Sequence, residues 1–375
     1  MTGTPLHLDI NSQLECAETL ASHFYTDPSI LALEKEKIFR RTWQLAGTLN
    51  QPCGEKNGVP YTIADPESFF TIELFGEPVV IVRDKSGVLR AFSNVCRHRG
   101  GPIAQGAGCR NVFNCAYHGW TYTLDGRLIG TPEIDGVEFF DRSTMGMVPL
   151  RLETWEQFIF VNFDAGAPPL SAFLGNIPQL AAEFSFNGLQ FAERRDYLVH
   201  CNWKVYVDNY LDAYHIPIVH PGLMKELDYP QYRTDTFRYH SRQLGPVKAL
   251  KANDTGERVY PPGSGLKDAL YFWVFPNLML NIYPDNIQTN LILPLSHEKT
   301  LTIFEWFFHD AQTEKVCERA KKVLAFSEEV QQEDIAICEA VQRGLLSSTY
   351  SRGRYSVKRE NGVHHFHTLL AEFLA

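Results

Sequence analysis

Hydrophobic and polar residues alternate in short runs through a region that begins near residue 42. Runs such as EPVVIVRD, NVFNCAYHG and FIFVNF are rich in β-branched and aromatic residues, and turn sequences such as DKSG and LDG separate them. This pattern is typical of strands that are joined by tight turns. We therefore expect antiparallel hairpins over residues 42–163.

The pattern changes on both sides of this region. Residues 30–43 place apolar positions among charges at helical spacing, which predicts an amphipathic helix packed on a larger body. The prolines of GAPPLSAF indicate the exit from the β region, and strand-like runs such as TNLILPL and TLTIFEWFF follow. We expect an α+β protein with an N-terminal helical segment at 1–41 and domains at 42–163 and 164–375.

A long helix is predicted from about residue 313 to residue 346, and one of its positions is unusual. Asp334 falls within the apolar face of this helix, where a carboxylate is costly unless a cation such as a metal ion compensates it. Local exposure of the face is the alternative. The apolar positions are Val316, Ala320, Val323, Val330, Ile337, Val341 and Leu345.

The overall charge and composition exclude some classes of function. The formal net charge of -9, without a cluster of basic residues, argues against a nucleic-acid partner. No run is long and apolar enough to cross a membrane, and the first residues do not resemble a signal peptide, so we expect a cytoplasmic protein. The 8 cysteines are scattered along the chain, which is unlike a disulfide framework.

Four side chains of types that bind metals form two short pairs, Cys96-x-His98 and Cys115-x-x-His118. Thiolate and imidazole bind zinc as well as the iron of iron–sulfur clusters, so a structural zinc site is one interpretation. The first pair is closer than in the usual zinc knuckle, and glycines flank both pairs. Such pairs suit a Rieske cluster, in which two cysteines hold one iron and two histidines hold the other.

A second group of candidate ligands lies in VDNYLDAYHIPIVHPGL. His215 and His220 are five residues apart, so they would diverge on a regular helix. Pro217 and Pro221 disfavour regular helix, and a bent backbone can bring both imidazoles together. A surface helix with unconnected histidines is the alternative.

With Asp334 as a third ligand, His215 and His220 would form the set of two histidines and one carboxylate that is typical of non-haem Fe(II) oxygenases. Such a set leaves positions open for O2 and substrate. Asp212, one helical turn before His215, can reach the far side of that imidazole and is our candidate catalytic residue. Asp208 is interpreted as a charge on the helix surface, and HHFH at 364–367 as a solvated segment.

The boxes CRHRGG and CAYHGW resemble those of the Rieske family. Respiratory Rieske proteins have additional disulfide cysteines where this chain has Gly101 and Tyr117, so the resemblance is to the oxygenase branch. With the second motif it covers the chain from IFRRTW to the last helix and identifies a catalytic α subunit of the Rieske non-haem iron oxygenases. The resemblance implies a Rieske domain of antiparallel strands and a helix-grip catalytic domain with an antiparallel sheet.

The resemblance also implies a [2Fe-2S] cluster, an Fe(II) ion and a head-to-tail homotrimer in which electrons pass between subunits, from His118 to Asp212. No strand is followed by GxGxxG and a helix, so a separate reductase, with or without a ferredoxin, should supply the electrons. A Rieske electron-transfer protein whose second domain only docks partners is the alternative class.

For the substrate, the second motif resembles the choline monooxygenase type, which acts on quaternary or methylated amines. The box of that type carries one more residue than this chain between the acid and the Tyr-His pair. We therefore expect hydroxylation or oxidative N-demethylation of such an amine. Aromatic faces can hold a cation. A ring-hydroxylating oxygenase for an aromatic acid is the alternative, in which these aromatics are core strand residues. The substrate-binding candidates are Tyr206, Tyr283, Trp306 and Phe308.

Overall fold

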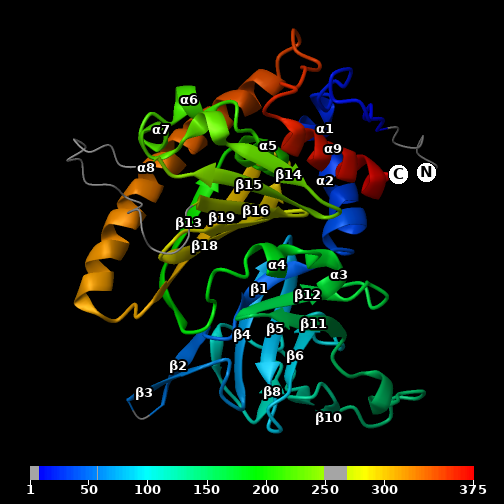
Figure 1. Cartoon of the computed structure of the whole chain (residues 1–375). Helices are drawn as coiled ribbons and strands as arrows, with labels where there is room; N and C mark the ends of the chain where they lie inside the picture. The colour runs from blue at the N-terminus through cyan, green and yellow to red at the C-terminus, as the bar shows by residue number, and fades with distance from the viewer. Residues whose placement is uncertain (1–7, 57, 249–267) are drawn as a thin grey trace. The chain divides into compact units, whose positions relative to one another are not determined.

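The computed structural model of the protein describes residues 8–56, 58–248 and 268–375. These residues form two compact units. Residues 40–170 make one unit, and the described residues up to 39 together with 171–375 make the other. Each unit is built on its own antiparallel sheet (Figure 1), so the predicted α+β class is confirmed.

The unit of residues 40–170 contains a 7-stranded sheet in the order β1-β12-β11-β6-β5-β4-β7, a 3-stranded sheet in the order β10-β9-β8 and the hairpin β2-β3. The run of valine and isoleucine in β5 is buried on both faces, which explains its continuous hydrophobicity. The strands are β1 Gln44–Thr48, β2 Pro52–Lys56, β3 Val59–Thr62, β4 Ser68–Leu74, β5 Glu77–Arg83, β6 Leu89–Ser93, β7 Ala107–Cys109, β8 Val112–Asn114, β9 Thr121–Thr123, β10 Leu128–Gly130, β11 Pro149–Trp155 and β12 Phe158–Asn162, with the 3-10 turn η2 Arg142–Thr144.

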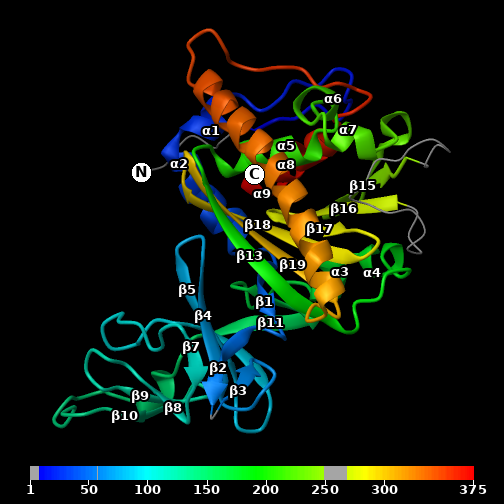
Figure 2. The ribbon, with the colours of Figure 1, turned by 90° about the vertical axis from the view of Figure 1, so that its left-hand side faces the viewer.

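The other unit is built on a 7-stranded sheet in the order β13-β19-β18-β17-β16-β15-β14. Helix α8 runs diagonally across this sheet (Figure 2). The strands are β13 Leu189–Val199, β14 Arg233–Thr236, β15 His240–Pro246, β16 Asp268–Val274, β17 Leu278–Ile282, β18 Asn286–Ser296 and β19 Lys299–His309. The helices are α1 His23–Thr26, α2 Pro28–Glu34, η1 Lys35–Phe39, α3 Leu170–Leu174, α4 Ile177–Leu180, α5 Trp203–Leu211, α6 Ile216–Val219, α7 Leu223–Glu226, η3 Tyr229–Gln231, α8 Glu314–Leu345 and α9 Asn361–Leu374.

Helix α8 matches the predicted helix in length, and Ala320, Val323 and Leu345 of the predicted face are buried, but other positions of that face are not. Ile337 and Val341 are exposed, whereas Gln331 and Gln342 are buried. Gln342 Oε1 accepts a hydrogen bond from the backbone N–H of Asn202, and Gln331 donates to a threonine hydroxyl of β19. The buried face is partly polar because α8 meets hydrogen-bonding partners there, which an apolar pattern cannot reveal. Among the described residues, no helix is long and apolar enough to cross a bilayer.

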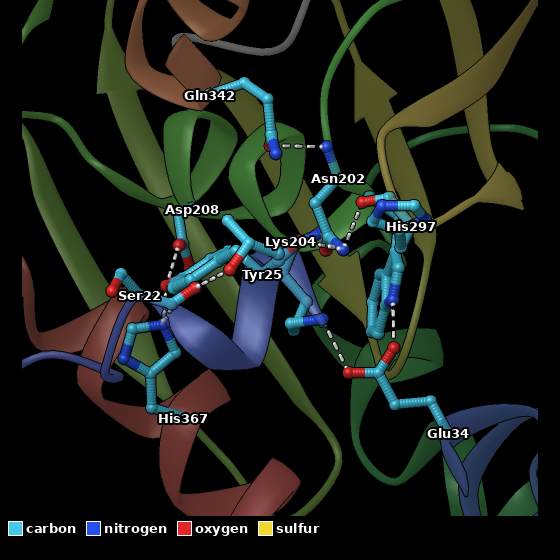
Figure 3. Close-up of polar contacts among 11 residues, drawn as sticks. Ser22, Tyr25, Glu34, Asn202, Lys204, Asp208, His297, Gln342 and His367 are labelled. Atoms are coloured by element: carbon cyan, nitrogen blue, oxygen red, sulfur yellow. Dashed lines mark hydrogen bonds and ion pairs between the residues drawn. The ribbon is translucent and has the colours of Figure 1, made fainter. Parts of the chain in front are cut away.

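A buried ion pair ties α2 to α5, the helix that leads to the predicted His215 site (Figure 3). The ammonium of Lys204 lies 2.6 Å from Glu34 Oε1, and the indole N–H of Trp203 donates to Glu34 Oε2 at 2.8 Å. The two charged side chains are 1% and 0% exposed. Burial raises the pKa of Glu34 and lowers that of Lys204, while the attraction between their charges opposes both shifts.

A second buried network joins α5 to α9 and corrects two of our interpretations (Figure 3). Asp208 is not a helix-surface charge, because its carboxylate accepts a hydrogen bond from Tyr25 at 2.7 Å and lies 2.9 Å from His367 Nε2. Residues 364–367 are not a solvated segment, because they lie within α9 and His367 is 1% exposed. Spacing along the chain could not reveal partners from both ends of the sequence.

We predict that Lys204→Met lowers the free energy of unfolding of this unit by about 3–5 kcal/mol, because it leaves the Glu34 carboxylate buried without its cation. Urea titration followed by tryptophan fluorescence measures the change. The double variant Glu34→Gln/Lys204→Met, which keeps an acceptor for Trp203, should recover much of the loss. Equal destabilisation of the single and double variants would contradict this explanation.

Candidate metal centres and pocket

The end of helix α5 places the two predicted histidines of the second motif. The helix ends at Leu211, and the chain continues through the extended residue Asp212 into the short helix α6. His215 precedes α6, His220 follows it, and Pro217 occupies its first turn. As a result His215 Nε2 and His220 Nε2 lie 3.1 Å apart, so the bend that we expected brings both imidazoles to one point.

Asp334 of helix α8 meets the two histidines at the same point. Its Oδ1 atom lies 3.0 Å from His220 Nε2 and 3.7 Å from His215 Nε2. One potential ligand atom from each of these three residues lies within 4.8 Å of the other two. The three residues are therefore close enough to hold one metal ion. Two imidazole nitrogens and one carboxylate oxygen suit a non-haem iron ion, so the donor set fits the predicted metal.

The electrostatic surroundings of His220 also favour a cation. Burial lowers the pKa of His220, but the carboxylates of Asp334 and Glu333 outweigh this effect and raise it above its ordinary value. The two carboxylates therefore favour positive charge at the His220 ring. A positive ion beside this ring would be stabilised in the same way.

Other side chains surround these candidate ligands. His220 Nδ1 makes a hydrogen bond of 2.7 Å with Glu333 Oε2. His215 Nδ1 lies 3.4 Å from Asp212 Oδ2, within ion-pair distance but without a hydrogen bond. The side-chain amide of Asn209 donates to Asp334 Oδ1 at 2.6 Å. Such contacts orient metal-binding imidazoles and carboxylates. We predicted the Asp212 contact from its helical spacing, but missed Glu333, whose only signal was its position next to Asp334.

The two Cys–His loops of the other unit have matching backbone geometry. The carbonyls of Cys96 and Cys115 each accept a hydrogen bond from a glycine N–H four residues later, at 3.0 and 2.9 Å. These glycines, Gly100 and Gly119, have φ angles of 73° and 71°. Residues other than glycine rarely adopt this backbone conformation. The tight turn after each cysteine therefore explains why a glycine lies beside the candidate ligands.

The side chains of these loops gather in a way that fits an iron–sulfur cluster. The rings of His98 and His118 have centroids 4.6 Å apart, and both cysteines are buried. His98 stacks on Trp120, and its Nδ1 atom is buried without a hydrogen-bond partner in the described part of the chain. A buried imidazole nitrogen without a partner is available to a metal. The hydroxyl of Tyr122, which sequence reasoning missed, lies 3.3 Å from Cys96 Sγ.

A pocket adjoins the three converging residues His215, His220 and Asp334, which form part of its lining. Aromatic and amide side chains form much of its wall, and no lysine or arginine of the described residues lines it. The aromatic residues are Tyr206, Tyr210, Tyr232, Tyr271, Tyr283, Phe304 and Phe326, and the amides are Asn209, Gln243, Asn281, Gln288, Asn290 and Gln331.

Two of the four predicted substrate-binding aromatics lie in this wall and two do not. Tyr206 and Tyr283 line the pocket, whereas Trp306 and Phe308 are fully buried outside it. Residues 304, 306 and 308 point to the same face of β19, because side chains alternate along a strand. Phe304 reaches the pocket, while the next two positions on that face lie farther along the strand and pack in the core.

Comparison with known proteins agrees with this arrangement. The family model for the "Rieske [2Fe-2S] domain" matches residues 60–141, and that for the "Ring hydroxylating alpha subunit (catalytic domain)" matches residues 186–375. These two matches define an O2-dependent oxidoreductase with a Rieske [2Fe-2S] cluster and a mononuclear non-haem iron. The chain belongs to the Rieske non-haem iron oxygenases, in the family of ring-hydroxylating α subunits.

Several relatives cover nearly the whole chain. It is 37% identical to the choline monooxygenase of Arabidopsis thaliana, over 95% of this chain and 83% of the relative, and 31% identical to the carnitine monooxygenase oxygenase subunit of Escherichia coli, over 95% and 94%. A solved quaternary ammonium Rieske monooxygenase superposes with a TM-score of 0.85 at 29% identity, over 99% of this chain and 100% of that chain. The plant relatives are named chloroplastic, so a cytoplasmic location remains a prediction.

We predict that Glu333→Gln weakens the binding of Fe(II) to the catalytic unit by about 10–100-fold, since the loss of a contact behind a metal-bound histidine typically has this effect. Anaerobic titration with Fe(II) after mild chelation measures the affinity, while the visible spectrum of the cluster reports an intact Rieske domain. Glu318→Gln, an exposed position on the same helix, is the control. Unchanged affinity in Glu333→Gln would refute the role of this contact.

Proposed function

We propose that the protein is the oxygenase component of a system that hydroxylates or oxidatively N-demethylates a quaternary or methylated amine. Residues 42–163 would form its Rieske domain and residues 164–375 its catalytic domain. The proposed cluster ligands are Cys96, His98, Cys115 and His118, and the proposed iron ligands are His215, His220 and Asp334.

The observation that carries the substrate class is the lining of the pocket beside the three converging residues. Aromatic rings attract organic cations through their electron-rich faces, and the tyrosines and phenylalanines of the wall supply such faces. Asp212, an acid that is not one of the proposed iron ligands, also lines the pocket, and no described lysine or arginine does. A pocket with this balance of charge favours a cationic substrate. The names of the choline and carnitine monooxygenases among the relatives support the same class.

The alternative substrate, an aromatic acid, fits this lining less well. Its carboxylate would find only neutral amide and tyrosine donors in the described wall, without a lysine or arginine, and it would face the like charge of Asp212. The likeness to naphthalene 1,2-dioxygenase, at 18% identity and a TM-score of 0.74, concerns the fold alone. An electron carrier without a catalytic site would not need the three converging ligands or the pocket beside them.

The residues of the pocket would act by binding and positioning. When bound, the iron supplies the chemistry of O2 activation, for which the Rieske cluster supplies electrons. Aromatic side chains would hold the ammonium group and exclude water from the reacting methyl or methylene group. Tyr210, which donates a hydrogen bond to Asn281 at 2.6 Å, and Tyr206, which donates to Gln331 at 2.5 Å, have rings fixed by these contacts. A rigid wall limits the orientations of a small substrate.

Electrons would enter the catalytic unit beside Asp212. His118 and its neighbour Tyr117 are exposed in the Rieske unit, so a second copy of the chain can approach this edge of the cluster site. A solved relative is described as a case of inter-subunit electron transfer. We propose a homotrimer in which Asp212 links His215 of one subunit to His118 of its neighbour, and a separate reductase, with or without a ferredoxin, that reduces the cluster.

The substrate class is tested by turnover and binding. The purified protein, supplied with a compatible reductase and NADH, should oxidise at least one of choline, glycine betaine and carnitine, with O2 consumption coupled to product. Benzoate should give neither product nor coupled O2 consumption. Coupled turnover of benzoate, together with no binding heat for any of the amines in calorimetry, would reject the proposed substrate class.

For the electron path, we predict that Asp212→Asn retains the trimer, the spectrum of the reduced cluster and most of the iron. Its single-turnover oxidation by O2 with substrate should slow by orders of magnitude, because the link between cluster and iron is lost. Stopped-flow absorbance of the cluster measures this rate.

Asp208→Asn is the matched comparison for Asp212→Asn, one helical turn earlier on α5. It should loosen the contacts to Tyr25 and His367, and so lower stability, but leave the electron-transfer rate close to that of the wild type. If Asp208→Asn stopped electron transfer while Asp212→Asn left it intact, the proposed link would lie at the wrong carboxylate.

A further inference from the structure

A segment of the Rieske unit, residues 132–141 between β10 and the turn η2, exposes an aromatic side chain that does not pack in the core. Phe139 is 103% exposed, the highest value among the large hydrophobic side chains described, and Val137 is 54% exposed. Phe139 also has a φ angle of 59°, which is unfavourable for a bulky residue. The fold gains no burial from this ring, whereas aromatic rings often anchor contacts between proteins.

The same segment is joined to a candidate cluster ligand by contacts between rings. Phe140, next to Phe139, meets Trp120 edge-on, with ring centroids 5.7 Å apart. Trp120 in turn stacks on His98, with centroids 4.8 Å apart and an angle of 8° between the rings. Trp120 is buried, and Phe140 packs against the core cluster that contains it. A protein bound on Phe139 would therefore be close to the cluster site, and electron transfer is fast only over short distances.

The charge of the segment indicates which kind of partner fits it. Residues 132–141 contain four acids and neither lysine nor arginine. All four acids are exposed, and they are Glu133, Asp135, Glu138 and Asp141. An exposed aromatic ring among acids suits a partner whose docking face has an apolar recess within a basic surface.

The loop that carries His98 has the opposite charge, which separates the segment from the proposed contact between subunits. Arg97 and Arg99 of the CRHRGG box are exposed. Three acids line the cavity of the catalytic unit that contains the proposed link residue, and they are Asp208, Asp212 and Glu360. A neighbouring subunit that offered this wall would attract the arginines and repel residues 132–141. The acidic segment therefore suits a different protein.

We propose that residues 132–141 are the docking surface for the reductase, with Phe139 as the central contact and the acids around it as attractive charges. The partner is an electron-transfer protein with a basic docking face. On contact the donor gives up one electron and one ferric ion of the cluster becomes ferrous, so no bond forms or breaks. This inference rests on the proposed function, because a separate reductase is part of it.

The test measures reduction of the cluster by stopped-flow absorbance without O2, with an NADH-dependent reductase that reduces the wild-type cluster as the donor. We expect Phe139→Ala to need about tenfold more reductase for the half-maximal rate, because truncation of a central aromatic contact typically weakens binding this much. A rate equal to that of the wild type at every reductase concentration would overturn the docking site.

Charge reversal tests the kind of partner. The double variant Glu133→Lys/Glu138→Lys should be reduced about tenfold more slowly at low ionic strength, and added salt should shrink the difference. Faster reduction of this variant would overturn the assignment of a basic docking face. Val59→Ala and Glu55→Lys, at exposed positions of the separate β2–β3 hairpin, are the matched controls and should behave as the wild type.

Dithionite separates docking from a defect of the cluster, because this small reductant needs no docking surface. It should reduce the wild type and Phe139→Ala at the same rate, with the same visible spectra before and after reduction. An equal loss of rate with dithionite and with the reductase would overturn the inference, since Phe139 would then support the cluster itself.

A single turnover reports the proposed function separately. The reduced protein, freed of reductase, is mixed with O2 and choline, and Phe139→Ala should react as the wild type does. If the wild type oxidised no amine but Phe139→Ala still weakened reduction by the reductase, the proposed substrate class would fail and the docking site would stand. If the wild type oxidised choline and Phe139→Ala were reduced normally, only the docking site would fail.

Discussion

The catalytic unit is organised around the close approach of three candidate ligand atoms, which come from both sides of helix α6 and from α8. His215 Nε2, His220 Nε2 and Asp334 Oδ1 lie between 3.0 and 3.7 Å apart. Each of them can offer a lone pair to one metal ion, and two imidazoles with one carboxylate suit non-haem iron. The break after α5 and the diagonal course of α8 over the sheet make the convergence possible (Figure 2), so the fold serves the geometry of one small site.

Buried polar contacts hold the helices that carry these atoms. Lys204 ties α5 to α2 through Glu34, and Asp208 ties the same helix to α9 through His367. Asn209, on the same helix, donates a hydrogen bond to Asp334 of α8. Helix α5 is therefore positioned by directional contacts in addition to apolar packing. Directional contacts fix the register of a helix better than hydrophobic surfaces, which can slide.

The sequence was most informative where ligands lie close together along the chain. The Cys–His boxes and the pair His215 and His220 are local patterns, and so is the helical spacing that connects Asp212 to His215. Asp334 was predicted because a carboxylate interrupted an apolar face. The structure brings it to the histidines, although it also shows that the face itself is turned toward Gln331 and Gln342 instead of Ile337 and Val341.

Contacts between residues that lie far apart in the sequence were not predicted. Glu333 contacts a histidine 113 positions away in the sequence, and nothing in the spacing of either residue indicates the other. Trp306 and Phe308 share a strand face with the pocket residue Phe304 but lie farther along the strand. The alternation of side chains predicts which face a residue occupies, but not which part of that face lines the pocket.

The most direct test of the account is the metal content and activity of Asp334→Ala. We expect this variant to keep the two cluster irons and the Rieske spectrum, to lose the remaining iron on mild chelation without recovering it from added Fe(II), and to form no product. A variant that retained the same iron content as the wild type after chelation, with normal turnover of the amine, would contradict the assignment of the catalytic centre.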